Sequence, residues 1–290
     1  MKFRHPLRLF FNALKLSRVN NLVIIIITQY FSAYFLIEKN SSVLEIVNDF
    51  NFFIMVLSTV IISASGYYIN DYYDVKIDLI NKPHKVIVGN KIKRRQVMLA
   101  HLAFNSVGIL LGLVVSYWIG LVNLVAAFLL WLYSNQLKRL PFVGNFVVAL
   151  LTGATLLTIG IYFRSSDLLL FMYAFFAFGI NLIREVIKDI EDVHGDASFG
   201  SKSLPVLFGI RKTKWVLYFL IVVYIGAMIF IMGTVNYTIL NYYFMLLTLP
   251  FTHFTYLLSK ADTKKHFSFL SKYCKWIILA GISSMILLKF

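Results

Sequence analysis

The segment FNFFIMVLSTVIISASGYYINDYYDVKID, residues 50–78, decides the fold. Residues 50–69 are almost entirely apolar, and about 20 such residues are what an α-helix needs to cross the hydrocarbon core of a bilayer. Directly after this run come Asn70 and the three aspartates Asp71, Asp74 and Asp78. The segment therefore predicts a membrane-spanning helix that ends in an acidic group.

Apolar runs of this kind recur along the whole chain, in which 59% of residues are hydrophobic and 14% are charged. They lack the alternating polar residues of a barrel strand, so in lipid they satisfy their backbone groups as helices. We predict an all-α polytopic membrane bundle of about nine transmembrane helices, although a turn around Gly120 that carries no charge leaves eight possible. The runs are 21–37, 50–69, 97–119, 121–134, 142–162, 167–187, 214–234, 238–258 and 272–289.

The polar connections are too short for a separate soluble domain, so residues 1–290 are predicted to form a single transmembrane domain. The basic N-terminal segment, residues 1–18, precedes an apolar run without a small-residue cleavage site, which favours a retained first helix over a signal peptide. The single cysteine, Cys274, excludes an internal disulfide and a cysteine-built metal site.

The formal net charge of +15 follows the expected membrane topology. With nine spans and the N-terminus inside, the basic residues from Lys2 and Arg4 onward face the cytoplasm, and only Lys39, Arg164 and Lys289 lie outside. This positive-inside pattern predicts an N-in, C-out orientation and contact with anionic membrane lipids. No basic stripe is interleaved with exposed aromatics, so we expect no nucleic-acid partner. We expect a cytoplasmic membrane, most simply a bacterial inner membrane; the oligomeric state is open.

A second acidic group lies in REVIKDIEDVHGDASFGSKSLP, residues 184–205, where Asp189, Asp192 and Asp196 repeat the spacing of the first group. On a helix, steps of three and four residues place side chains on one face. Such a carboxylate stripe repels itself unless cations occupy it, and hard oxygen ligands suit Mg²⁺, which often shares its shell with substrate phosphates. A solvated helix end explains either group alone, whereas two matched groups predict a site for a metal-bound diphosphate.

These two segments resemble the UbiA-type intramembrane prenyltransferases, a family of nine-helix membrane proteins. NDYYDVKID, residues 70–78, matches the N-D-x-x-D-x-x-x-D motif after the second helix, and DVHGD, residues 192–196, matches D-x-x-x-D after the sixth. The closest-looking branch contains the archaeal digeranylgeranylglyceryl phosphate synthases. This chain has NKPHKV at residues 81–86 where relatives have N-R-P-x-R-P, so lysine keeps the charge without the bidentate fork of arginine.

The resemblance implies a Mg²⁺-dependent transferase that moves a prenyl group, most simply geranylgeranyl, from a prenyl diphosphate to a membrane-associated acceptor. The favoured acceptor is a geranylgeranylglyceryl phosphate-type lipid, and the product would be an ether lipid precursor. The alternatives are an aromatic quinone precursor of the homogentisate, hydroxybenzoate or naphthoate type, or a chlorophyllide-type acceptor.

The resemblance also implies roles for single residues. The metal ligands implied by motif match are Asn70, Asp74, Asp192 and Asp196. Further acids, a cation and an aromatic wall are expected to assist the reaction: Asp71, Asp78, Asp189, Lys188 and Tyr133. The cations expected to contact diphosphate are Lys138 in the family-like stretch YSNQLKR, Arg184, Lys188, Arg18 and Lys82. For these cations, topology and ion pairing with Glu185 or Glu191 are the alternative explanation.

Electron-rich rings near the motifs would stabilise an allylic cation through cation–π contact, although tyrosines are also common at membrane interfaces. The rings concerned are Tyr67, Tyr68, Tyr72, Tyr73 and Tyr133.

Two other classes fit less well. The CDP-alcohol phosphotransferases need D-G-x-x-A-R, and the sequence contains neither a D-G nor an A-R pair. A cation transporter would place its acids near midspan, whereas these acids lie at the ends of spans.

Overall fold

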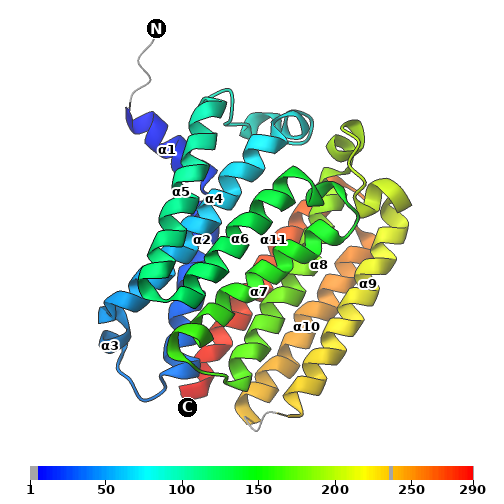
Figure 1. Ribbon diagram of the computed structural model, residues 1–290. Helices are drawn as coiled ribbons and strands as arrows, with labels where there is room; N and C mark the ends of the chain where they lie inside the picture. Colours follow the sequence, from blue (N-terminus) through cyan, green and yellow to red (C-terminus); the bar gives the residue numbers. More distant parts are fainter. Residues whose placement is uncertain (1–5, 235–237, 290) are drawn as a thin grey trace. The chain divides into compact units, whose positions relative to one another are not determined.

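The computed structural model describes residues 6–234 and 238–289, and this part of the chain contains helices and no strand (Figure 1). Lys2 and Arg4, which the predicted topology places inside, lie outside the described residues. The helices are α1 (Pro6–Leu16), α2 (Val19–Phe31), η1 (Ser32–Ile37), α3 (Val43–Asn48), α4 (Phe50–Asn81), η2 (Pro83–Lys85), α5 (Arg94–Val115), α6 (Tyr117–Asn135), η3 (Leu137–Arg139), α7 (Val143–Phe163), α8 (Leu168–Ser198), α9 (Leu204–Met232), α10 (Thr238–Lys260), α11 (Lys264–Ser283) and η4 (Ser284–Lys289).

Each predicted apolar run is helical over most of its length, which confirms the all-α fold of an integral membrane protein. Within the described residues, 8 helical segments are long and apolar enough to cross a membrane. The run 238–258 forms α10, which is helical but is not among these 8. The 8 segments are Val19–Ile37, Phe50–Asn81, Arg94–Val115, Tyr117–Asn135, Val143–Phe163, Leu168–Ser198, Leu204–Met232 and Lys264–Lys289.

The chain divides into two compact units. Unit 1 comprises Met1–Ile27 and Leu44–Leu137, and unit 2 comprises Thr28–Val43 and Lys138–Phe290. The first acidic group lies in unit 1 and the second in unit 2. A single domain over residues 1–290 stays a prediction.

In unit 1, helices α4, α5 and α6 pack side by side (Figure 1). The predicted turn around Gly120 is wrong: the chain breaks at Ser116, whose side chain caps α6 by accepting a hydrogen bond from the Trp118 amide. Gly120 lies inside α6, where a Cβ atom would collide with Leu113 of α5. The glycine is therefore needed for the close approach of two helices, and the polar serine makes the turn.

A small apolar core in unit 1 supports the acidic end of α4. Its buried members are Leu16, Tyr68, Val88, Ile92 and Val97, which come from four separate parts of the chain. The Tyr68 hydroxyl also donates to the carbonyl oxygen of Ala13 in α1, at 3.3 Å. Burial of this apolar surface fixes α1, α4 and the loop after α4 together.

In unit 2, helix α8 is central, with α7, α9 and α11 packed against it (Figure 1). Gly179 of α8 lies directly under the Tyr224 ring of α9, which a Cβ atom would penetrate. Small residues at such points let membrane helices approach closely. Helix α9 contains a break at Gly209, whose φ of 77° belongs to the region that favours glycine.

Candidate active site

The first acidic group forms the last turns of helix α4. The helix begins with the Asp49 side chain, which accepts a hydrogen bond from the Phe52 amide at 3.1 Å, and continues through the motif to Asn81. Asp71, Asp74 and Asp78 are therefore helical, as their spacing predicts. Asp74 is buried, with 5% of its surface exposed.

Asn70 joins two of these acids. Its Nδ2 atom donates to Oδ2 of Asp74 at 2.8 Å and lies 3.5 Å from Oδ1 of Asp71. A side-chain amide has two donor hydrogens and an acceptor oxygen, so one asparagine can orient two neighbouring carboxylates. Asn70, the asparagine of the N-D-x-x-D motif, therefore orients two carboxylates in unit 1.

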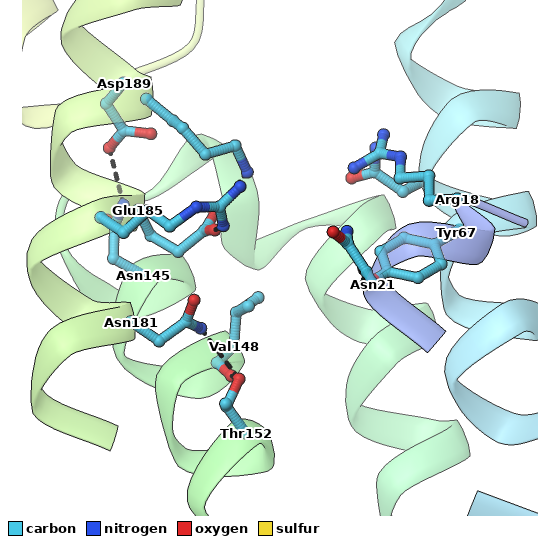
Figure 2. A network of polar contacts seen from close by, with 12 residues as sticks. Arg18, Asn21, Tyr67, Asn145, Val148, Thr152, Asn181, Glu185 and Asp189 are labelled. Carbon is cyan, nitrogen blue, oxygen red and sulfur yellow. Dashed lines mark hydrogen bonds and ion pairs between the residues drawn. The ribbon is translucent and has the colours of Figure 1, made fainter. Parts of the chain in front are cut away.

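Arg18 is bound to the same acidic group. Its Nη2 atom lies 2.7 Å from Oδ1 of Asp71, and its guanidinium carbon lies 4.9 Å from the centroid of the Tyr67 ring. The hydroxyl of Tyr67 accepts a hydrogen bond from Nδ2 of Asn21 at 3.1 Å (Figure 2). Burial alone would lower the pKa of Arg18, but the Asp71 carboxylate outweighs it and the pKa is raised overall.

The backbone of Arg18 is unusual because its φ of 51° lies in the left-handed region, between α1 and α2. Such a conformation is uncommon for a residue with a side chain and costs about 1–3 kcal/mol. The ion pair with Asp71 and the contact with Tyr67 are the interactions that hold this turn in place.

The other tyrosines of α4 have separate environments. Tyr68 belongs to the buried core and packs edge to face on Phe104, so it has a packing role. Tyr72 and Tyr73 contact each other edge to face at 5.3 Å, and the Arg94 guanidinium lies 4.6 Å from the Tyr72 ring. In unit 1, Tyr67 and Tyr72 therefore make cation–π contacts with arginines of the same unit.

Two expected diphosphate-binding lysines lie at helix ends. Lys82 is the C-cap of α4, and its amide donates to the carbonyl oxygen of Asp78 at 2.7 Å. Lys138 lies half-buried in η3, in unit 2. The neighbouring Arg139 carbonyl accepts from the Lys202 amide at 2.9 Å, which ties η3 to the loop after α8. Tyr133 lies half-buried in the last turn of α6, in unit 1.

The second acidic group forms the last part of helix α8, so Asp189, Asp192 and Asp196 are also helical. Asp196 is 6% exposed. Asp189 accepts a hydrogen bond from Nδ2 of Asn145, a residue of α7, at 2.9 Å (Figure 2). Asn145 is itself buried and was not predicted as a site residue.

Glu185 lies one turn before Asp189 and forms ion pairs through both of its oxygens. Oε1 lies 2.9 Å from Nη1 of Arg184, and Oε2 lies 2.7 Å from Nζ of Lys188. The two cations expected to contact diphosphate therefore share one carboxylate in unit 2. Ion pairing with Glu185, which the sequence left as an alternative, is present.

A further polar contact continues toward the N-terminus of α8. Nδ2 of Asn181 donates to Oγ1 of Thr152 at 2.8 Å, and this hydroxyl donates to the Val148 carbonyl at 2.9 Å (Figure 2). Asn181, Glu185 and Asp189 follow each other at intervals of one helical turn. This polar stripe inside an apolar span was the sequence signal that could have identified Asn181 and Glu185.

Magnesium fits the chemistry of both acidic groups, because carboxylate and amide oxygens are the hard ligands that it prefers. Within residues 6–234 and 238–289, no three His, Cys, Asp or Glu side chains are arranged around a common metal position. The metal role of Asn70, Asp74, Asp192 and Asp196 stays a prediction.

Comparison with known proteins settles the family. The sequence model described as the UbiA prenyltransferase family matches residues 27–278, which is most of the chain. The chain belongs to the UbiA prenyltransferase family. This match confirms the family resemblance that the two acidic segments indicated.

Several curated relatives of this UbiA protein are named digeranylgeranylglyceryl phosphate synthase. The relative from Methanosphaera stadtmanae is 39% identical over 156 residues, which cover 54% of this chain and 57% of the relative. That from Thermococcus kodakarensis is 40% identical, and this chain spans 55% of its length. The Saccharolobus solfataricus relative is 34% identical over 232 residues, covering 78% of this chain and 80% of the relative. The chain thus spans little more than half the length of the first two.

Solved structures share the fold. A structure described as giving insights into digeranylgeranylglyceryl phosphate synthase in membranes is 25% identical with a TM-score of 0.66, covering 96% of this chain and 97% of that one. A UbiA homologue from Archaeoglobus fulgidus bound to GPP and Mg²⁺ has a TM-score of 0.64 at 17% identity, covering 95% of this chain and 99% of that one. At 17% identity, the similarity to the Archaeoglobus fulgidus structure shows only that the fold is shared.

Proposed function

We propose that this UbiA protein transfers a prenyl group from a prenyl diphosphate to a membrane-associated acceptor, with Mg²⁺ as cofactor. The preferred donor is geranylgeranyl diphosphate, and the preferred acceptor is a geranylgeranylglyceryl phosphate-type lipid. The names of the curated relatives support this choice of acceptor, including the one that aligns with 78% of this chain.

The observation that carries the proposal is the pair of acidic helix ends. Helix α4 and helix α8 each extend past their apolar run and end in three aspartates of the same spacing. Six carboxylates in two groups are costly to place beside a membrane without cations. Magnesium ions bound to a diphosphate would supply such cations.

The chain's own residues have the following roles in the proposal. In unit 1, Asn70 and Asp74 hold metal, while Asp71 and Asp78 adjoin them. In unit 2, Asp192 and Asp196 hold metal, with Asp189 beside them. When bound, Mg²⁺ neutralises the negative charge that grows on the leaving diphosphate. The cations that bind diphosphate oxygens are Lys138, Arg184, Lys188, Arg18 and Lys82.

In the reaction, the allylic C–O bond of the donor breaks and an acceptor hydroxyl oxygen bonds to the same carbon, with loss of its proton. An electron-rich ring such as Tyr133 supports positive charge on the prenyl group without attacking it. Groups that act only on the transition state raise the rate, so we expect the acids to affect kcat more than donor binding.

We further propose that the protein lies in a cytoplasmic membrane with its N-terminus inside and both acidic groups on the cytoplasmic side. The distribution of lysine and arginine supports this orientation. The organisms of the curated relatives are archaea, so an archaeal cytoplasmic membrane suits the proposal as well as a bacterial inner membrane.

An acceptor panel tests the proposal. Purified protein in lipid nanodiscs receives Mg²⁺, prenyl diphosphates of several lengths and either a geranylgeranylglyceryl phosphate or an aromatic acceptor, and product masses are recorded. The expected product is the glyceryl phosphate lipid with one added geranylgeranyl group. Prenylation of the aromatic acceptors alone would overturn the choice of acceptor, and no product with any pair would overturn the reaction.

A further inference from the structure

Glu185 is a buried carboxylate in the spanning helix α8, with 5% of its surface exposed. It lies on the same stretch of helix as Asp189 but is not part of either aspartate motif (Figure 2). An ionised carboxylate is expensive to bury, and in membrane helices such residues mark functional sites more often than packing sites.

Glu185 forms a separate ion pair with each of two cations. One oxygen binds Arg184 at 2.9 Å and the other binds Lys188 at 2.7 Å, so each cation has its own partner atom. All three side chains are shielded, with exposed side-chain fractions of 15% for Arg184, 27% for Lys188 and 7% for Glu185. Ion pairs in such surroundings are screened less by solvent than surface pairs.

Arg184 is incompletely satisfied. Its Nη1 atom donates to Glu185, whereas its Nε atom is buried and has no hydrogen-bond partner among the described residues. An arginine offers five N–H donors in a rigid fork, and an unsatisfied buried donor costs about 1–3 kcal/mol. The guanidinium is therefore held by Glu185 while one of its buried donors has no acceptor among the described residues.

Two cations around one carboxylate leave a local positive charge, one helical turn before the second acidic group. A planar guanidinium with an adjacent ammonium suits phosphate oxygens, which take several charge-assisted hydrogen bonds at once. If position 185 served only to pack α8 against its neighbours, an apolar residue would suffice there. Arg184 and Lys188 would then not be needed as ion-pair partners.

We propose that Glu185 is a positioning residue: it fixes Arg184 and Lys188 so that both donate to the phosphate oxygens of an anionic substrate. This inference rests on the proposed function. The phosphate has two sources, the diphosphate of the prenyl donor and the phosphate of the glyceryl lipid acceptor.

The substitution Glu185→Gln distinguishes a role in positioning the two cations from an effect of the negative charge alone. Glutamine keeps the size but has a single acceptor oxygen, so it can hold only one of the two cations. It also raises the local positive charge by one, which by Coulomb attraction alone would tighten anion binding. Weaker anion binding in spite of the added charge is the signature of positioning.

The experiment compares wild type, Glu185→Gln and the control Glu45→Gln, which makes the same charge change at an exposed position of α3. In nanodiscs with Mg²⁺ we expect Glu185→Gln to lower kcat/KM about tenfold or more. A higher Ki for pyrophosphate identifies the donor diphosphate as the anion, and a higher KM for the lipid acceptor identifies its phosphate. The control keeps wild-type constants.

A double variant tests whether Glu185 acts through Arg184. In an Arg184→Gln background, the further change Glu185→Gln is expected to add little, whereas independent effects would multiply. Multiplying effects, or wild-type constants in Glu185→Gln, overturn the proposal. Thermal unfolding in nanodiscs establishes that each variant is folded.

Pyrophosphate binding, measured by calorimetry with Mg²⁺ and without turnover, separates this inference from the proposed function. If wild type fails to transfer prenyl groups, the proposed function is wrong, yet weaker binding by Glu185→Gln still supports the positioning role. Equal or tighter binding of both pyrophosphate and the glyceryl phosphate acceptor by the variant, measured in the same way, overturns that role whatever the activity.

Discussion

Asn145 of α7 donates a hydrogen bond from Nδ2 to Oδ2 of Asp189 in α8, at 2.9 Å. It is a contact between two neighbouring helices at the point where the second acidic group begins. Asp189 accepts this hydrogen bond from a neutral amide, so the contact orients the side chain without forming an ion pair.

Asn145→Ala is expected to lower the turnover number about tenfold, since a hydrogen bond to a charged group is worth about 1.5–3 kcal/mol. Asn145→Asp should be worse than Asn145→Ala, because a second carboxylate would repel Asp189. The rate of pyrophosphate release checks this order. The exposed Asn40→Ala serves as control, and full activity in Asn145→Ala would remove the role of this contact.

Arg18 and Asp71 are expected to behave as a coupled pair in a double-mutant cycle. Arg18→Gln and Asp71→Asn should each reduce activity, and the double variant should be no worse than the more damaging single one. The side chains are 37% and 21% exposed, so we expect a coupling in stability of only about 1 kcal/mol. Strictly additive losses in the melting temperature and activity would contradict the pairing.

Gly179→Ala should destabilise unit 2. The added Cβ atom meets the Tyr224 ring, and overpacking of this kind costs about 1–3 kcal/mol. Gly226→Ala, one helix away, is the matched control, because no atom lies within 4 Å of its Cβ position. Alanine there should leave stability unchanged or raise it, since it favours helix over glycine. Thermal unfolding in nanodiscs measures both, and equal stability of the two variants would contradict the packing argument.

The helices were predictable from the sequence because membrane spans depend on a local property, the length of apolar runs. The paired acidic groups were predictable because each forms a stripe within one helix, as the spacing of Asp71, Asp74 and Asp78 indicates. The boundary between α5 and α6 was misplaced, because Ser116 makes the break, while Gly120 lies inside α6 and serves close packing.

The partners of the acids were harder to find, because they depend on how helices pack. Asn145 precedes Asp189 by many residues and carries no motif, and only the packing of α7 on α8 brings them together. Arg18 reaches Asp71 through a left-handed backbone turn that sequence spacing does not reveal. Glu185 was visible as an alternative partner, but its contact with two cations needed the helix geometry.

Asp74→Asn should reduce turnover by at least about 100-fold while leaving the fold intact. The amide keeps the size of the side chain and can still accept from Asn70, but it loses the charge that a hard cation needs. Asp262→Asn, whose side chain is 83% exposed, is the control for the loss of one carboxylate. Unchanged activity in Asp74→Asn would exclude it as a metal ligand.

The central claim is that prenyl transfer depends on Mg²⁺ held by the aspartate groups. The most direct measurement follows pyrophosphate and prenylated lipid together, from geranylgeranyl diphosphate and geranylgeranylglyceryl phosphate. The account predicts one pyrophosphate per product molecule, loss of both on chelation and recovery on adding Mg²⁺. Product formation that persists without divalent metal, or in Asp74→Asn, would contradict it.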